Sequence, residues 1–218
     1  TSAPTLEQLQ PTRVNTDPLN VYIGNPNLKP SFRHNFNAGY NFYNVLKEKN
    51  MFTNFNFGFT DNAFVQASLV DSTGKRTYFT VNADGNYNMG LYSSYGFKIK
   101  GFSWRNGIGP RFNINRNVEY INNVKNINNT KTIGIELSTN TYKPEKHNVW
   151  LSSSFNWNDS KSSVNAEANA SYWSVNLNGS GSLTFAKKFE VGSDLSMQFR
   201  ENDPRFPDAN NFTTWNGY

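Results

Sequence analysis

Apolar and polar residues alternate through residues 77–97, and this alternation is the most informative pattern in the chain. In its second half the apolar positions are Tyr87, Met89, Leu91, Tyr95 and Phe97, separated by Asn, Gly, Tyr and Ser. A period of two residues is typical of a strand with two different faces. A continuous strand over residues 76–98 would extend ~70 Å, far beyond the ~5 to 6 residues usual in soluble proteins. We therefore expect it to cross a bilayer and project beyond it.

The alternation recurs along the chain and predicts eight strands without a competing helical period. They cover residues 33–44, 51–67, 76–98, 101–121, 130–142, 147–158, 169–186 and 189–201. Short lysine-bearing turns alternate with longer polar connections at 68–76, 121–130, 158–169 and 201–213. Tight turns at one end and long loops at the other are typical of outer-membrane barrels. The predicted fold class is therefore all-β, an antiparallel up-and-down transmembrane β-barrel.

Bulky aromatic residues gather near the ends of the predicted strands. Aromatic girdles mark both lipid interfaces of membrane barrels. We expect lipid-interface aromatics at the short-turn side (Tyr40, Tyr95, Phe97, Phe102, Trp104, Phe185 and Phe189) and at the long-loop side (Phe79, Tyr120, Trp157 and Trp173).

The opposite face of the strands consists mainly of Asn, Ser and Gly. Its predicted charged members are Asp84, Arg105, Arg111, Glu119 and Glu136. Such groups are costly to remove from water without partners, so this face is expected to line a water-filled or plugged lumen. The five charged residues are candidates for contact with cargo or plug.

Composition fits a thin structure that is apolar outside and polar inside. Only 36% of the residues are hydrophobic, but 16% are aromatic and 36 are asparagine. The aromatic content argues against disorder. The absence of cysteine excludes disulfides and thiolate chemistry. No run of ~18 apolar residues predicts a membrane helix, and residues 1–20 show no signal-peptide pattern, which favours a mature chain or a fragment.

Nucleic-acid binding, catalysis and metal or cofactor binding are not expected. The net charge is +5, but the cations are scattered and form neither a basic helix nor a phosphate loop. The only histidines are His34 and His147, no G-x-S-x-G motif occurs, and no acidic or histidine cluster has metal-ligand spacing. The sequence therefore predicts a protein that is not an enzyme.

A soluble β-sandwich or β-helix adhesin is the alternative, because its strands would alternate in the same way. Its apolar faces would pack inward and its asparagine faces would meet solvent. Strand length, aromatic strand ends and alternating loop sizes favour the membrane barrel.

The most specific motif lies within DPLNVYIGNPNLKPSFRHNFNAGYNFYN, residues 17–44. It comprises Gly24, Asn25, Pro26, Asn27, Leu28, Lys29 and Pro30. The segment resembles the C-terminal part of TonB-dependent receptors, where a G-N-P-x-L-K-P-E-like motif enters a descending strand. It is most similar to SusC-like outer-membrane proteins of Bacteroidota, although Ser31 replaces the usual Glu. Proline fixes φ and removes a donor, so a structural role is expected for the motif, with the chain joining the sheet just after Pro30.

The resemblance implies a barrel of about 22 strands with an N-terminal plug and a TonB box. Residues 1–32 would be an extracellular loop segment and residues 33–218 an incomplete part of the barrel. Residues 213–218, TTWNGY, would enter a further strand.

The implied function is TonB-dependent import of a bulky nutrient, such as an oligosaccharide, peptide or metal chelate, in the outer membrane of a Gram-negative bacterium. Short turns would be periplasmic and long loops extracellular. Expected partners are outer-membrane lipid, lipopolysaccharide, plug, TonB and a surface lipoprotein or other subunit. The alternatives are a non-transporting scaffold in an outer-membrane complex and a complete barrel of eight strands.

Overall fold

The computed structural model describes residues 1–218 except 12, 18, 102, 187 and 203–210, and no side chain is described for residues 13–16. Almost all of its regular structure is β. The elements in chain order are α1 (Leu6–Leu9), β1 (Arg13–Asp17), β2 (Asn20–Ile23), β3 (Phe32–Asn44), β4 (Lys49–Asp61), β5 (Ala63–Val70), β6 (Arg76–Ala83), β7 (Asn86–Lys98), β8 (Arg105–Ile121), β9 (Val124–Lys143), β10 (His147–Ser162), the 3₁₀ turn η1 (Ala166–Ala168), β11 (Ala170–Phe185), β12 (Phe189–Arg200) and β13 (Phe212–Gly217). No helix in the described part of the chain is long and apolar enough to cross a membrane.

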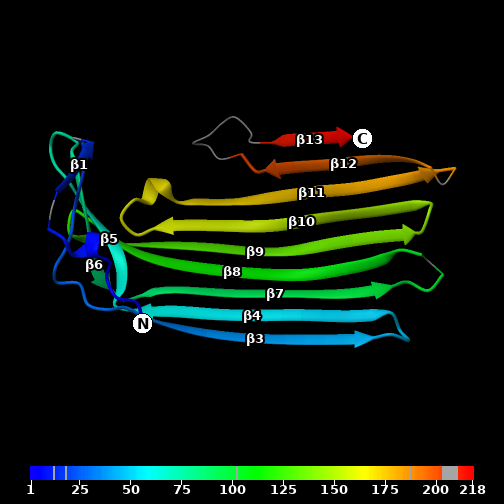
Figure 1. Cartoon of the computed structure of the whole chain (residues 1–218), viewed down its shortest axis with the longest axis horizontal. Coiled ribbons are helices and arrows are strands. Elements are labelled where there is room, and N and C mark those ends of the chain that lie inside the picture. Colours follow the sequence, from blue (N-terminus) through cyan, green and yellow to red (C-terminus); the bar gives the residue numbers. More distant parts are fainter. Residues whose placement is uncertain (12, 18, 102, 187, 203–210) are drawn as a thin grey trace.

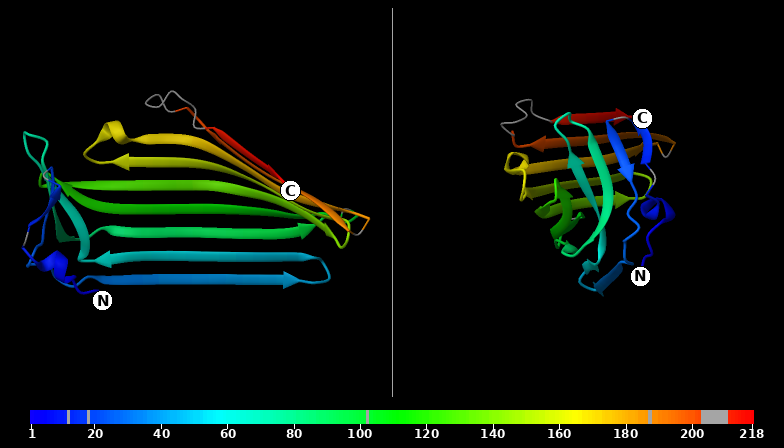
Figure 2. Two further views of the ribbon diagram at one scale, coloured as in Figure 1. Left: turned by 45° about the horizontal axis from the view of Figure 1, so that its top comes forward. Right: turned by 90° about the vertical axis from the view of Figure 1, so that its left-hand side faces the viewer.

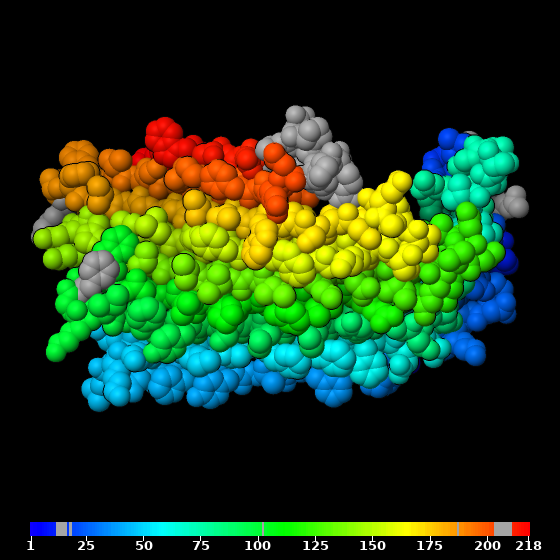
Figure 3. Space-filling model, turned by 180° about the vertical axis from the view of Figure 1, so that it is seen from behind, coloured from blue at the N-terminus to red at the C-terminus, as the bar shows by residue number. Residues whose placement is uncertain are grey.

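Nine strands lie side by side and form what we call the wall sheet. Its order is β3, β4, β7, β8, β9, β10, β11, β12 and β13, and every neighbouring pair is antiparallel (Figure 1). Figure 3 shows the same strands following one another in chain order across the surface. Within the described residues, β3 pairs only with β4 and β13 only with β12. The wall sheet is therefore open at both edges, and this structure is not a closed barrel of eight strands.

Four short strands, β1, β2, β5 and β6, form what we call the end sheet. Figure 2 shows them lying across one end of the wall sheet rather than along it. β2 pairs with β6 and β5 pairs with β8, both in parallel, and the second pairing joins the two parts. The most buried apolar cluster lies at this junction and contains Ala63, Val65, Ala83 and Val118. The core therefore fixes the end sheet to the outer part of β8.

The predicted strands at 51–67 and 76–98 are each broken, so the expectation of one long strand through residues 76–98 was wrong. Asn62 separates β4 from β5 and has φ 51°, while Gly85 lies between β6 and β7 with φ 111°. A positive φ turns the chain away from extended backbone and is favoured by Gly and Asn. β6 consequently leaves the wall, and Phe79, expected at the lipid interface, lies in the end sheet.

The predicted long loop at residues 121–130 was also wrong. β8 and β9 continue to Ile121 and Val124 and are joined by Asn122 and Asn123, with φ 49° and 64°. Two consecutive residues with positive φ form the tight turn that matches strand twist. The remaining strand predictions, within a few residues of the observed bounds, are confirmed, and residues 213–218 do enter a further strand, β13. Residues 1–32, expected to be irregular, contain α1, β1 and β2.

Candidate functional site

The register of the wall sheet separates its side chains into one apolar and one polar face. Phe57 is paired with Phe36 on one side and Met89 on the other. Ile133 is likewise paired with Phe112 and Trp157. Because directly paired residues point to the same side of a sheet, apolar side chains form continuous rows across the strands. The asparagine, serine and glycine positions form the opposite face.

The apolar face is largely uncovered. Trp173 is 59% exposed and Phe189 is 68% exposed, and they lie at opposite ends of the same face. Contiguous apolar surface of this extent is uncommon on soluble proteins and marks contact with another apolar phase. Beyond Trp157 on β10 the same face carries Asp159 and Lys161, which form an ion pair with 3.5 Å between Lys161 Nζ and Asp159 Oδ2. The apolar band on this strand therefore ends at Trp157.

Most predicted interface aromatics occupy the ends of this band. On the short-turn side, Tyr40 is on β3, Tyr95 and Phe97 stack on β7 with 5.7 Å between ring centroids, and Phe185 is paired with Phe189. Trp104 precedes β8. On the other side, Trp157 is paired with Trp173. Phe102 lies outside the described residues.

Tyr120 does not lie at a lipid boundary, contrary to the sequence prediction. It lies on the outer extension of β8 and packs against the buried cluster that contains Val65 and Val118. Its backbone neighbour across the parallel pairing is Ala67 of β5. The hairpin β5–β6, which the sequence prediction had placed in the wall, covers this aromatic ring instead.

Asparagine side chains on the polar face lie over glycines of the neighbouring strand. A Cβ at Gly90 would lie 2.5 Å from Asn56 Oδ1, and one at Gly58 would lie 2.8 Å from Asn88 Oδ1. The same relation links Gly134 and Asn156. A side chain at Gly90 or Gly58 would displace an asparagine amide, and one at Gly134 would also meet the backbone carbonyl of Phe155. The polar face is a low layer of amide groups rather than a set of long side chains.

The five predicted lumen-facing charges do not form one site. Arg111 and Glu136 lie in the middle of the polar face, on neighbouring strands β8 and β9. Arg111 donates from Nε and Nη2 to Asn156 Oδ1 of β10, at 2.8 and 2.5 Å. Arg105 lies at the short-turn end, where β8 begins. Among the described residues, none of the recorded ion pairs joins these charges to one another.

Glu119 and Asp84 serve the outer end of the molecule instead of the lumen. Glu119 Oε1 accepts hydrogen bonds of 2.8 Å from the side-chain amides of Asn126 and Asn128. Asp84, at the bend between β6 and β7, accepts the backbone N–H of Asn62 at 2.7 Å. Asp84 thereby holds the backbone at the bend and Glu119 holds two asparagine side chains of β9, so only Arg111 and Glu136 remain central candidates.

The first part of the Gly24–Pro30 motif is held against the N-terminal turn and β6. A Cβ at Gly24 would lie 2.0 Å from the carbonyl oxygen of Gln10, so only glycine permits this approach. The Asn25 backbone N–H donates to Gln8 O at 2.6 Å, and its side-chain amide donates to Thr80 O at 2.9 Å. These contacts are those of a folded structural segment.

Asn82 anchors the second part of the motif, and the sequence analysis did not single it out. Its Oδ1 accepts the N–H of Lys29 at 2.7 Å, while its Nδ2 donates to Lys29 O at 2.9 Å and Asn62 O at 2.8 Å. Leu28, the residue before Lys29, is buried. β3 begins at Phe32, two residues after Pro30. Asparagine is too frequent in this chain for its anchoring role to be recognised without the structure.

Comparison with known families decides which apolar phase the exposed face meets. The family model of the outer membrane protein beta-barrel family matches residues 1–122. The chain belongs to this family. The match includes the end sheet and the first wall strands, through β8. No curated protein and no solved structure matched the chain.

Membership of the outer membrane β-barrel family assigns a different environment to each face of the wall sheet. The exposed aromatic and aliphatic side chains face lipid, and the amide layer faces the barrel interior. The soluble sandwich or β-helix alternative is not supported, because the apolar face has no packed partner among the described residues. The functional surface of this chain is therefore a membrane wall.

Proposed function

We propose that this chain is part of the wall of a TonB-dependent receptor that imports a bulky nutrient across the outer membrane. The observation that carries the proposal is the open wall sheet, whose edge strands β3 and β13 are not paired with each other. Backbone donors and acceptors at a sheet edge are very costly in lipid, so further strands must complete the barrel. A barrel of more strands has a wider lumen.

The polar face and the motif support the same proposal. Amide and hydroxyl groups spread over nine strands suit a wetted interior that contacts a plug or cargo without one dominant charge. The Gly24–Pro30 segment resembles the corresponding segment of SusC-like receptors. We further propose a plug, TonB and a surface lipoprotein as partners, with short turns periplasmic and long loops extracellular.

We assign no catalytic role or cofactor to the chain. His34 Nε2 lies 3.0 Å from Asp61 on the apolar face at the outer end of β3, and His147 lies 3.3 Å from Thr141 at the start of β10. Neither arrangement contains the nucleophile, base and acid of a hydrolytic site.

Energy-dependent uptake by cells that carry or lack the full-length gene tests the proposal. The probes are a labelled oligosaccharide, a peptide and a ferric chelate, each measured with and without a protonophore. We expect accumulation of one probe that requires both the gene and the proton gradient. Equal accumulation of every probe by both strains would refute import and favour a scaffold role.

A double variant tests the lumen assignment. Replacing Arg111 and Glu136 with glutamine should alter uptake when uptake is normalised to the amount of folded protein in the membrane, whereas Lys131→Gln on the apolar face serves as the control. Unchanged uptake by the double variant would remove both residues from the cargo path.

A further inference from the structure

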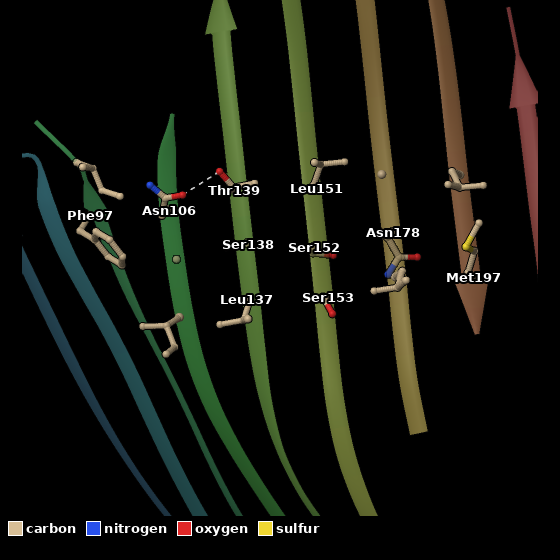
Figure 4. A pocket seen from close by; sticks show the side chains of 16 residues that line it. Phe97, Asn106, Leu137, Ser138, Thr139, Leu151, Ser152, Ser153, Asn178 and Met197 are labelled. Atoms are coloured by element: carbon tan, nitrogen blue, oxygen red, sulfur yellow. Dashed lines mark hydrogen bonds between the residues drawn. The ribbon is translucent and has the colours of Figure 1, made fainter. Parts of the chain in front are cut away.

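A groove of about 650 Å³ crosses the apolar face near the short turns. Six strands, β7 to β12, contribute to it (Figure 4). Its apolar lining includes Phe97, Ile108, Leu137, Leu151, Leu177 and Leu195. Gly179 on β11 adds no side chain to this face, and Leu151 Cδ2 lies only 3.0 Å from where its Cβ would be. Small residues between large ones thus hollow a face that is otherwise covered by side chains.

The polar side chains that lie on the groove's own face of the sheet are Asn106, Thr139 and Ser153, and Ser153 Oγ is buried without a hydrogen-bond partner in the described part of the chain. Thr139 Oγ1 donates to Asn106 Oδ1 at 3.0 Å across β8 and β9, as the dashed line in Figure 4 shows. No charged side chain is among the described residues that line the groove. Its chemistry is that of a hydrocarbon chain rather than of a sugar or peptide.

Positive charge is concentrated at the adjacent ends of the strands. The four short turns and their flanking residues carry nine cationic and three anionic side chains, a formal charge of +6 in a chain of +5. The cations are Lys47, Lys49, Lys98, Lys100, Arg105, Lys143, Lys146, Lys187 and Lys188, and the anions are Glu48, Glu145 and Glu190. The rest of the molecule is therefore almost neutral.

Two exposed lysines continue directly from the groove lining. Lys100 follows Ile99, which lines the groove. Lys143 lies on the same face of β9 as Leu137 and Thr139, because alternate residues of a strand share a face. Within the part of the chain that the structure describes, no ion pair includes Lys100 or Lys143, whereas Lys98 Nζ lies 3.0 Å from Glu48 Oε2.

We propose that the groove holds an acyl chain of an anionic glycerophospholipid, whose phosphate lies between Lys100 and Lys143. The groove accepts hydrocarbon, and the positive turns accept the headgroup at the level where the apolar band ends. Charge argues for this occupant over a second copy of the chain, since a symmetric contact through this end would bring two groups of +6 together. The inference rests on membership of the membrane-barrel family and not on import.

Lipid retention by the full-length protein tests the proposal. The protein is purified in mild detergent, stripped of lipid and mixed with equal amounts of phosphatidylglycerol and phosphatidylethanolamine. Native mass spectrometry then counts the lipids bound per chain. We expect one retained phosphatidylglycerol, with a preference that falls about thirtyfold for each lysine reversed to glutamate, because the reversal changes the juxtamembrane charge by two units.

Matched variants separate the headgroup site from general attraction. Lys143→Glu and Lys100→Glu should lose the preference. Lys131→Glu should keep it, because Lys131 is an exposed lysine on the same face of β9 but is paired with Asp159, beyond the opposite end of the apolar band. Gly179→Leu, which fills the groove, should lose the bound lipid itself. A photoreactive acyl chain should label groove peptides of β7 to β12 in the wild-type protein, a readout that does not depend on any variant folding.

Equal retention of the two lipids, or equal behaviour of Lys143→Glu and Lys131→Glu, would overturn the proposed headgroup site. Labelling concentrated on β3 and β4 would overturn the groove assignment. A doubled mass with chain-to-chain cross-links in the groove would show that a second copy occupies it.

Discussion

Replacing Gly134 with alanine should destabilise the wall sheet through a single contact on the polar face. Arg111 reaches across β9 at Gly134 to donate two hydrogen bonds to Asn156, whose side chain is almost completely buried. A Cβ at position 134 would lie 2.3 Å from Asn156 Oδ1, 2.8 Å from the carbonyl oxygen of Phe155 and 3.2 Å from Arg111 Nε. The backbone carbonyl cannot move away cheaply, so the arginine and the asparagine must separate.

The expected loss is about 1 to 3 kcal/mol of unfolding free energy. Each hydrogen bond from a charged donor contributes roughly 1.5 to 3 kcal/mol, and the half-exposed position of Arg111 places both bonds near the lower value. Alanine offsets about 0.4 to 1 kcal/mol by restricting the unfolded chain. Gly39→Ala is the matched control, because the nearest heavy atom to its Cβ would be Thr53 O at 3.9 Å.

The assay is denaturant unfolding of the full-length protein in detergent, followed by tryptophan fluorescence. The midpoint should fall for Gly134→Ala and stay constant or rise for Gly39→Ala. Asn156→Ala and the double variant complete a cycle, in which the two changes should be strongly non-additive because they remove the same contact. Equal midpoints for Gly134→Ala and Gly39→Ala, or full additivity in the cycle, would refute the reasoning.

Three further predictions concern the end sheet. Val65→Asp buries an unpaired charge in the junction and should expose the β5–β6 hairpin to limited proteolysis. Gln66→Asp, on the exposed side of β5, should not. Equal cleavage rates for the two variants would contradict this role for the core cluster. Hydrogen bonds to the Asp71 carboxylate, first from the side chain of Thr73 and then from backbone N–H groups, lower the pKa of Asp71 below its usual 3.8. The stabilising effect of these bonds is complete above pH 3.8 and is lost as the pH falls through the lowered pKa. Thr73→Ala should raise that pKa in a carboxyl NMR titration, and an unchanged titration would refute the cause. Asn82→Asp loses two hydrogen-bond donors and places a carboxylate against two carbonyl oxygens. Proteolytic cleavage within residues 1–31 should therefore accelerate, and the unfolding free energy should fall by ~1 to 3 kcal/mol. A protease-resistant variant would contradict the anchoring role.

Alternation predicted the wall strands well because their two faces meet different media along their whole length. Phe55, Phe57 and Phe59 could only share one face, and the observed register places them there. The same rule failed at Asn62 and Gly85, where alternation continues across a change in backbone direction. Periodicity records which side a residue faces, but it does not record where the strand bends.

The polar face was predictable as a surface but not as a set of contacts. Arg111 and Glu136 were correctly placed on it, yet the acceptor of Arg111 lies two strands away, on β10. Glu119 and Asp84 obey the same alternation but lie at the end of the wall next to the end sheet, where they accept hydrogen bonds from Asn126 and Asn62. Only the register and the bends distinguish these positions. The consecutive residues Asn122 and Asn123 signal a tight turn, although a long polar loop was predicted at residues 121–130.

The two bends at Asn62 and Gly85 also bear on how the family can diversify. Thr60 and Asn86 are directly paired across β4 and β7, so the chain leaves the wall and returns to it at adjacent positions. The turn between β5 and β6 can therefore lengthen or shorten without shifting the register of a single wall strand. Sequence variation can thus accumulate at that turn, while the junction with β8 and the frame of wall strands are inherited intact.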